Sequence, residues 1–185
     1  MLADTARFAA LAGELAAGTP CAPRRARAVA DYLGLLCDSI HHHHRIEDEV
    51  LWPTLTAAAG DAVDVRELTD DHAQLDPMLA EIRAACADLV ARRPDAAGVL
   101  AERLTRLHTV LDEHIADEER TVFPIVAAYV TTAQWEKVEA AARCAVAAVW
   151  SPSRSASSAR TVSTGPKATD PESRPAMVPA LGSRS

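Results

Sequence analysis

Residues 41–53 read HHHHRIEDEVLWP, and no other stretch of the chain sets so many metal-capable side chains beside an apolar, helix-like run. The stretch has a counterpart 71 residues further along, because residues 114–124 read HIADEERTVFP. The two share the pattern H-x-x-x-E-[DE]-x-x-[LV]-[WF]-P. The repeat predicts two helices that present the same set of side chains.

His43 and Glu47 in the first stretch correspond to His114 and Glu118 in the second. A helix turns by about 100° per residue, so a His and a Glu four residues apart lie one above the other on a single face, within reach of one ion. Neutral imidazoles donate nitrogen to a metal, and ionised carboxylates bridge cations and offset their charge. The two helix faces could therefore hold a metal between them.

A third motif, Asp70-Asp71-His72, lies between the two repeated stretches. With these three ordered motifs, the chain resembles the hemerythrin-like, HHE cation-binding family over roughly residues 1–150. The resemblance implies an all-α fold, an up-down-up-down four-helix bundle of the hemerythrin type around a non-haem di-iron site.

The resemblance also assigns metal ligands to the positions that match the motifs. Its histidines are expected to donate nitrogen and its glutamates to bridge the two ions. The expected metal ligands are His43, His44, Glu47, His72, His114 and Glu118. His44 is included because the family often has a second polar residue directly after the first ligand. The remaining histidines are predicted to be surface residues: His41, His42 and His108.

Two positions leave the ligand set open. Asp76 lies four residues after His72, where the oxygen carriers of the family have a second histidine, and Pro77 follows it. One iron would then lack a nitrogen donor. Glu119 competes with Glu118, since some family members use a carboxylate five residues after the histidine. On a regular helix, however, Glu119 would face away by about 140°.

One family ligand has no counterpart in the sequence. In the family the first helix contributes a histidine, but no histidine precedes His41 here. The 71-residue offset places the counterpart of His72 at Met1. We expect either that this ligand lies at or just before Met1, or that water replaces it and iron occupancy is nearer one ion than two.

These patterns support three functional hypotheses. The first is a non-haem di-iron protein for oxygen, redox or iron sensing or handling, with dioxygen or a related diatomic molecule or peroxide as ligand. The second is a di-iron enzyme that consumes peroxide or nitric oxide, which the same residues would support. The third is a helical interaction module that binds metal adventitiously, because a His and a Glu four residues apart are often only a helix-stabilising pair.

Composition narrows the partners. The formal charge is −7, and the last 35 residues carry five Arg or Lys and two Asp or Glu, which leaves −10 on residues 1–150. An acidic domain repels the phosphate backbone, so we expect no nucleic acid as a partner. No stretch approaches the ~20 apolar residues of a membrane span, and charges interrupt the N-terminal apolar run, so we expect a cytoplasmic protein. Four separated cysteines without a C-x-x-C pair predict free thiols.

Apolar periodicity predicts five helices. The first covers residues 2–17, and the second starts near Pro23, runs through the histidines and ends or bends at Pro53. A third follows Asp64 as candidate N-cap, and a fourth follows a turn at residues 92–95 and reaches Pro124. The capping-box pattern that starts at Thr131 opens a short fifth helix over about residues 132–149.

The composition changes after residue 150. Residues 151–185 are rich in Ser, Pro, Arg and Thr and show almost no apolar periodicity. Such a segment cannot bury enough surface to offset its ordering entropy. We therefore expect one metal-binding domain over residues 1–150 and a disordered C-terminal tail over residues 151–185.

Overall fold

The structure, a computed structural model, describes residues 1–149, and their side chains as far as residue 143. Contacts divide the chain into Met1–Ser151 and Pro152–Ser185. The expected division into a metal-binding domain over residues 1–150 and a tail over residues 151–185 stays a prediction. The tail expected over residues 151–185 lies outside the described residues.

The described part is helical throughout, with no strand. Its elements are α1 (Leu2–Ala16), α2 (Pro23–Ile46), a π-helical turn η1 (Glu47–Leu51), α3 (Trp52–Ala59), a 3-10 turn η2 (Gly60–Ala62), α4 (Arg66–Val90), α5 (Ala96–Tyr129) and α6 (Thr132–Val149). Because α2, η1 and α3 follow one another directly, they form one long helical segment. The predicted all-α class is confirmed.

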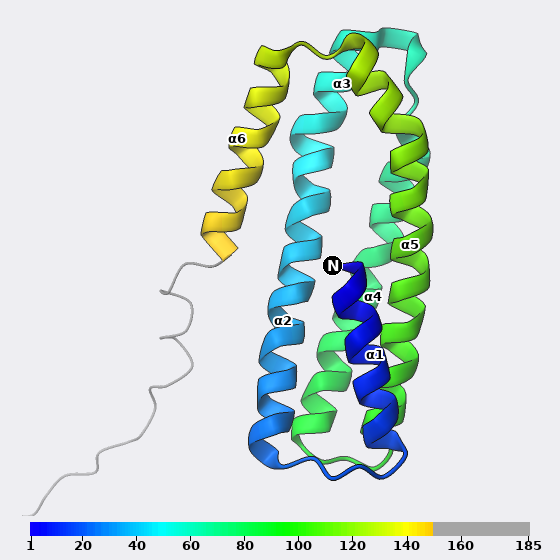
Figure 1. Ribbon diagram of the computed structural model, residues 1–185, viewed down its shortest axis with the longest axis vertical. Helices are drawn as coiled ribbons and strands as arrows, with labels where there is room; N and C mark the ends of the chain where they lie inside the picture. Colours follow the sequence, from blue (N-terminus) through cyan, green and yellow to red (C-terminus); the bar gives the residue numbers. More distant parts are fainter. Residues whose placement is uncertain (150–185) are drawn as a thin grey trace, which may run out of the picture. The chain divides into compact units, whose positions relative to one another are not determined.

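Neighbouring helices of the bundle run in opposite directions (Figure 1). Helix α5 packs against α1 and α4, and α2 packs against α4 and α6. The connections between consecutive helices are short, which favours antiparallel neighbours. The predicted up-down-up-down bundle with an added fifth helix is confirmed. Helix α1 is short, and Figure 1 shows that it begins part-way along the bundle.

Local sequence explains most helix ends. Pro23 occupies the first turn of α2, where its missing N–H costs nothing. Gly18 follows α1 with φ +102°, a conformation that glycine adopts easily. Before α6, the Thr131 N–H donates to Gln134 Oε1 at 2.9 Å and the Gln134 N–H donates to Thr131 Oγ1 at 3.4 Å. The predicted capping box is therefore present.

Other predicted boundaries are wrong in detail. The N-cap of α4 is Val65, and Asp64 instead accepts a hydrogen bond from the Arg66 N–H at 3.1 Å, one position before the cap. Helix α5 does not stop at Pro124 but continues to Tyr129. At Pro53, where the second helix was expected to end or bend, the helical path passes through the π-helical turn η1 just before the proline and continues as α3.

Two apolar clusters fill the bundle. The larger one includes Ile40 of α2, Leu75 of α4 and Leu111 of α5. The smaller includes Leu68 of α4 and Val122 of α5. On each helix a short stretch of chain separates the residues of one cluster from those of the other. These intervening stretches contain the residues that build the candidate site.

Candidate metal centre

A layer of polar side chains crosses the interior between the two apolar clusters. Helix α2 and the turn η1 contribute His44 and Glu47, α4 contributes His72, and α5 contributes His114 and Glu118. Each of these residues is at most 8% exposed. Three helical segments thus change from apolar to His or Glu side chains at the same level of the bundle. A single chemical requirement at that level would explain the change.

The turn η1 orients the first of these segments. The Trp52 N–H donates to the Glu47 carbonyl, five residues back, instead of the usual four. Pro53 has no N–H, and in a regular helix its ring would crowd the carbonyl of Glu49, so the wider turn relieves this position. The extra residue in the turn allows Glu47, Leu51 and Trp52 all to be buried.

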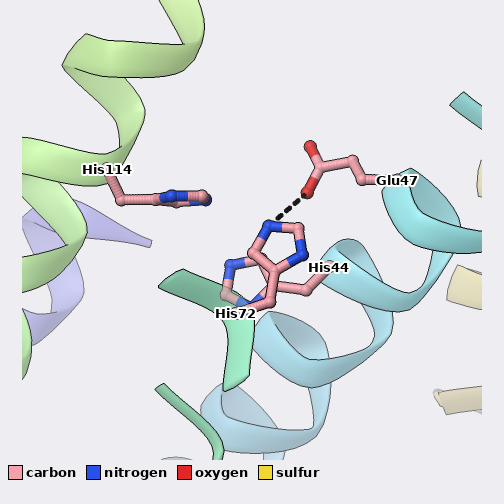
Figure 2. A group of neighbouring side chains, drawn as sticks. All are labelled: His44, Glu47, His72 and His114. Atoms are coloured by element: carbon pink, nitrogen blue, oxygen red, sulfur yellow. Dashed lines mark ion pairs between the residues drawn. The ribbon is translucent and has the colours of Figure 1, made fainter. Parts of the chain in front are cut away.

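His44, Glu47, His72 and His114 form the first group of candidate ligands. One ligand atom from each lies within 4.8 Å of the others. Figure 2 shows the three rings and the carboxylate converging from three directions. The rings of His44 and His72 stack with centroids 4.3 Å apart, and the ring of His114 meets that of His72 edge-on at 4.9 Å.

A second group adjoins the first and shares Glu47 with it. It consists of His43, Glu47 and Glu118. The His43 Nε2 atom lies 3.1 Å from Glu47 Oε1, and the side chain of His43 is 44% exposed. Glu118 Oε1 lies 3.7 Å from the Nε2 atom of His114, so both carboxylates lie close to both groups. The first group is buried, whereas the second reaches the surface.

Burial and crowding alter the protonation of these groups. Burial, followed by the neighbouring Glu118 carboxyl, raises the pKa of Glu47 to about 9. Burial also raises the pKa of Glu118. Burial and then the other histidines lower the pKa of His44 to about 2, and the same causes lower that of His43. At neutral pH, His44 and His43 are therefore neutral imidazoles with a free lone pair, and Glu47 holds a proton in the absence of a cation.

The donors of the layer fit a cation. Several of their buried atoms have no hydrogen-bond partner: His44 Nδ1, Glu47 Oε2, His72 Nε2, His114 Nδ1, His114 Nε2 and Glu118 Oε1. Each unsatisfied buried polar atom costs roughly 1–3 kcal/mol. A whole domain is stable by only about 5–15 kcal/mol, so this many atoms left without a partner would be a large cost. A cation that the nitrogens and carboxylates share would offset it.

An aspartate outside the layer orients His72, and a second aspartate lies near His114. The distance from His72 Nδ1 to Asp48 Oδ1 is 3.0 Å, so an N–H on this nitrogen donates to the carboxylate and leaves the lone pair of Nε2 free. His114 Nδ1 lies 3.6 Å from Asp71 Oδ2. Sequence reasoning did not assign either aspartate a role, although Asp71 lies in the third motif and Asp48 in the first.

The structure brings all six predicted ligands together in the two groups. It differs from the prediction in the relative positions of His43 and His44. His43 was expected as the main ligand of its helix and His44 as the addition, but His44 lies in the buried group and His43 at its edge. Asp76 is exposed and pairs with His41 at 2.9 Å, away from the layer. Glu119 is exposed, as the facing argument predicts. Metal binding by the six residues stays a prediction.

The predictions for other residues near the site vary in outcome. His108 is not a free surface residue, because its Nδ1 lies 3.0 Å from the hydroxyl of the fully buried Thr5. His42 is half-buried and lines a cavity beside the second group. Met1 lines the same cavity, so the position that the repeat assigns to the missing histidine lies beside that group. A ligand at or before Met1 stays a prediction.

The comparisons with known proteins identify the chain. The sequence model of the family described as "Hemerythrin HHE cation binding domain" matches residues 2–126, which contain every residue of both groups. Searches of curated proteins and of solved structures find no match. In the part of the chain that the structure describes, no helix is long and apolar enough to span a membrane.

Proposed function

The chain belongs to the hemerythrin HHE cation-binding domain family, and on this premise we propose that it holds two non-haem iron ions for oxygen, redox or iron sensing or handling. The main support is the buried polar layer, in which His and Glu side chains from three helical segments converge and several of their nitrogen and oxygen atoms have no hydrogen-bond partner. Glu47 would connect the two ions, because it belongs to both groups.

In this proposal the four histidines are divided between the two ions. His44, His72 and His114 would donate nitrogen to the first ion, and His43 to the second. Mixed imidazole and carboxylate ligation suits iron. The cations would remove the proton that Glu47 holds in their absence, because positive charge favours the ionised carboxyl. In the ferrous state, the ions would supply the electrons with which dioxygen is bound or reduced.

A specific observation favours the enzymatic alternative as a second candidate. The cavity beside the second group gives a small molecule a path to His43, Glu47 and Glu118. Consumption of peroxide or nitric oxide requires such access and an open coordination position. The buried first group, by contrast, contributes three histidines and would hold its ion more firmly.

Metal analysis and the absorption spectrum of aerobically purified protein test the proposal. We expect stoichiometric iron, an oxo-to-iron charge-transfer band, and earlier loss of the more exposed second ion to a mild chelator. Turnover of hydrogen peroxide or nitric oxide by iron-loaded protein would support the enzyme. Iron that is substoichiometric, spectrally featureless and removed in one step would contradict a specific di-iron site.

A further inference from the structure

A cavity of about 530 Å³ lies beside the second group, with a lining drawn from α2, η1, α5 and α6. Its walls are mainly apolar side chains, among them Ile46, Leu51, Ile115, Phe123, Trp135 and Val138. The three residues of the second group, His43, Glu47 and Glu118, line it as well. The cavity thus combines a largely apolar wall with the donors of the second group, and Glu119 and Glu139 add two further carboxylates to its lining.

The aromatic residues of the wall remain exposed. Phe123 is 61% exposed and Trp135 is 37% exposed. The internal repeat pairs Phe123 with Trp52, yet Trp52 is only 4% exposed. The π-helical turn buries Trp52, whereas Phe123 lies in the regular helix α5. Two large apolar side chains therefore border a cavity without filling it, which is typical of a ligand site.

The size of the cavity argues for an organic ligand. Small-molecule sites commonly have volumes of roughly 300–1,000 Å³, mostly apolar walls and a few placed polar groups. A molecule the size of water needs only about 30 Å³. A cavity of about 530 Å³ is therefore much larger than a diatomic gas requires.

The composition of the second group indicates which kind of chemical group on a ligand could bind its ion. This group offers one nitrogen and two carboxylates, whereas the first offers three nitrogens. An ion in the second group would have coordination positions left for an outside ligand. His44, His72 and His114 do not line the cavity, so a molecule in it meets the second group only.

Resting on the proposed function, we propose that this cavity binds an organic molecule with a ring-sized apolar body and one anionic oxygen head. The apolar body contacts Phe123 and Trp135, and the head is a ligand of the second ion. The carboxylates of Glu119 and Glu139 also line the cavity. They repel an anion unless a cation is present, so binding depends on the loaded metal.

The probe for the test is 2-naphthoate, with acetate as the same head without the apolar body. Both are titrated calorimetrically into the full chain, first loaded with ferric iron whose content is measured, and then into the metal-free chain. We expect 2-naphthoate to bind the iron-loaded chain at least about tenfold more tightly than acetate, and neither anion to bind the metal-free chain.

Substitutions in the cavity wall distinguish binding in this cavity from non-specific hydrophobic binding elsewhere on the surface. Trp135→Ala and Phe123→Ala should each weaken 2-naphthoate several-fold and leave acetate unchanged. Ala142→Trp, which fills the cavity from α6, should abolish the preference for 2-naphthoate. Tyr129→Ala is the matched control, because Tyr129 is an aromatic residue outside the lining whose exposure, 47%, lies between those of Trp135 and Phe123. Circular dichroism and iron content confirm that each variant is folded and loaded.

The outcomes distinguish this inference from the proposed function. A chain that takes up no iron contradicts the proposed function. An iron-loaded chain that binds the two anions equally contradicts the cavity proposal alone. So does 2-naphthoate binding that Trp135→Ala, Phe123→Ala and Ala142→Trp leave unchanged, or that is as strong without iron.

Discussion

The two carboxyl oxygens of Glu47 face different candidate groups, and each lies at a different distance from the nearest histidine nitrogen. Its Oε1 lies 3.1 Å from His43 Nε2, and its Oε2 lies 3.6 Å from His72 Nε2. The first distance is near the upper limit of a hydrogen bond, and the second is beyond it. A buried carboxylate oxygen that faces a buried nitrogen across such a gap is better satisfied by a shared cation than by the nitrogen alone.

Two histidines of the layer, His72 and His114, are predicted to be essential for iron binding. His72→Ala and His114→Ala should each abolish stoichiometric iron, because each removes a nitrogen from the buried group. His41→Ala is the matched control within the same histidine run, since His41 is exposed and pairs with Asp76 outside the layer. Iron per chain after desalting is the measurement. Equal loss in all three variants would indicate unfolding or surface chelation.

Asp48, which lies beside the His72 ring, is predicted to strengthen iron binding without being a ligand. Asp48→Asn should weaken iron about 10–100-fold without removing a ligand, because the carboxylate accepts the hydrogen bond that orients the His72 ring. Asp76→Asn, which changes an aspartate bonded to a surface histidine, should leave iron affinity unchanged. Competition with a chelator of known affinity measures both. Equal affinities for the two variants would remove the orienting role of Asp48.

At the scale of helices, two C-termini use the same motif with different residues. After α1, Gly18 has φ +102°, and after α4, Arg92 has φ +57°. In both, the N–H of this residue and the N–H of the residue after it donate to carbonyls of the last helical turn, as in a Schellman motif. Only glycine adopts this left-handed conformation without a steric cost.

Arg92→Gly should therefore stabilise the protein by about 1 kcal/mol, and Gly18→Arg should destabilise it by a similar amount. For a chain of this size the corresponding shifts in Tm are roughly 2–4 °C, upward and downward. Thermal unfolding followed by circular dichroism measures them. A lower Tm for Arg92→Gly would show that the Arg92 side chain contributes more than its backbone strain costs.

Most elements could be predicted from the sequence because their signals are local. Pro23, Gly18 and the Thr131 capping box act through the backbone of one turn. The π-helical turn could not be predicted, because the hydrophobic periodicity of the sequence does not reveal one extra residue in a helical turn. His44 was ranked below His43 because the repeat pairs His43 with His114, and the packing of three helices, which the repeat does not contain, decides which of two adjacent histidines is buried. The bond between His108 and Thr5 depends on the packing of α1 against α5, which no single segment specifies.

At the scale of the whole described bundle, the polar layer lies between two apolar clusters and makes the metal-free protein sensitive to pH. The pKa of His44 falls from 6.5 to about 2 on folding, so its contribution is complete above pH 6.5 and is lost as the pH falls toward 2. The pKa of Glu47 rises from 4.5 to about 9, so its contribution is complete below pH 4.5 and is lost as the pH rises toward 9.

The metal-free protein should consequently be most stable between about pH 4.5 and 6.5, and its Tm should fall from pH 6.5 to pH 9. Glu47→Gln should flatten the alkaline fall, because glutamine does not ionise. Iron should also flatten it and raise the Tm, since cations compensate the ionised carboxylate and bind the folded state. Thermal scans across this pH range check the prediction. An alkaline fall that Glu47→Gln leaves unchanged would assign it to other groups.

Anomalous X-ray scattering from iron-loaded crystals is the most direct test of whether the buried polar layer holds iron. Difference maps measured on either side of the iron absorption edge locate iron without any assumption about ligands. We expect one peak among His44, Glu47, His72 and His114, and a second, weaker peak beside His43, Glu47 and Glu118. Iron found only at surface histidines such as His41, or no ordered iron at all, would contradict this expectation.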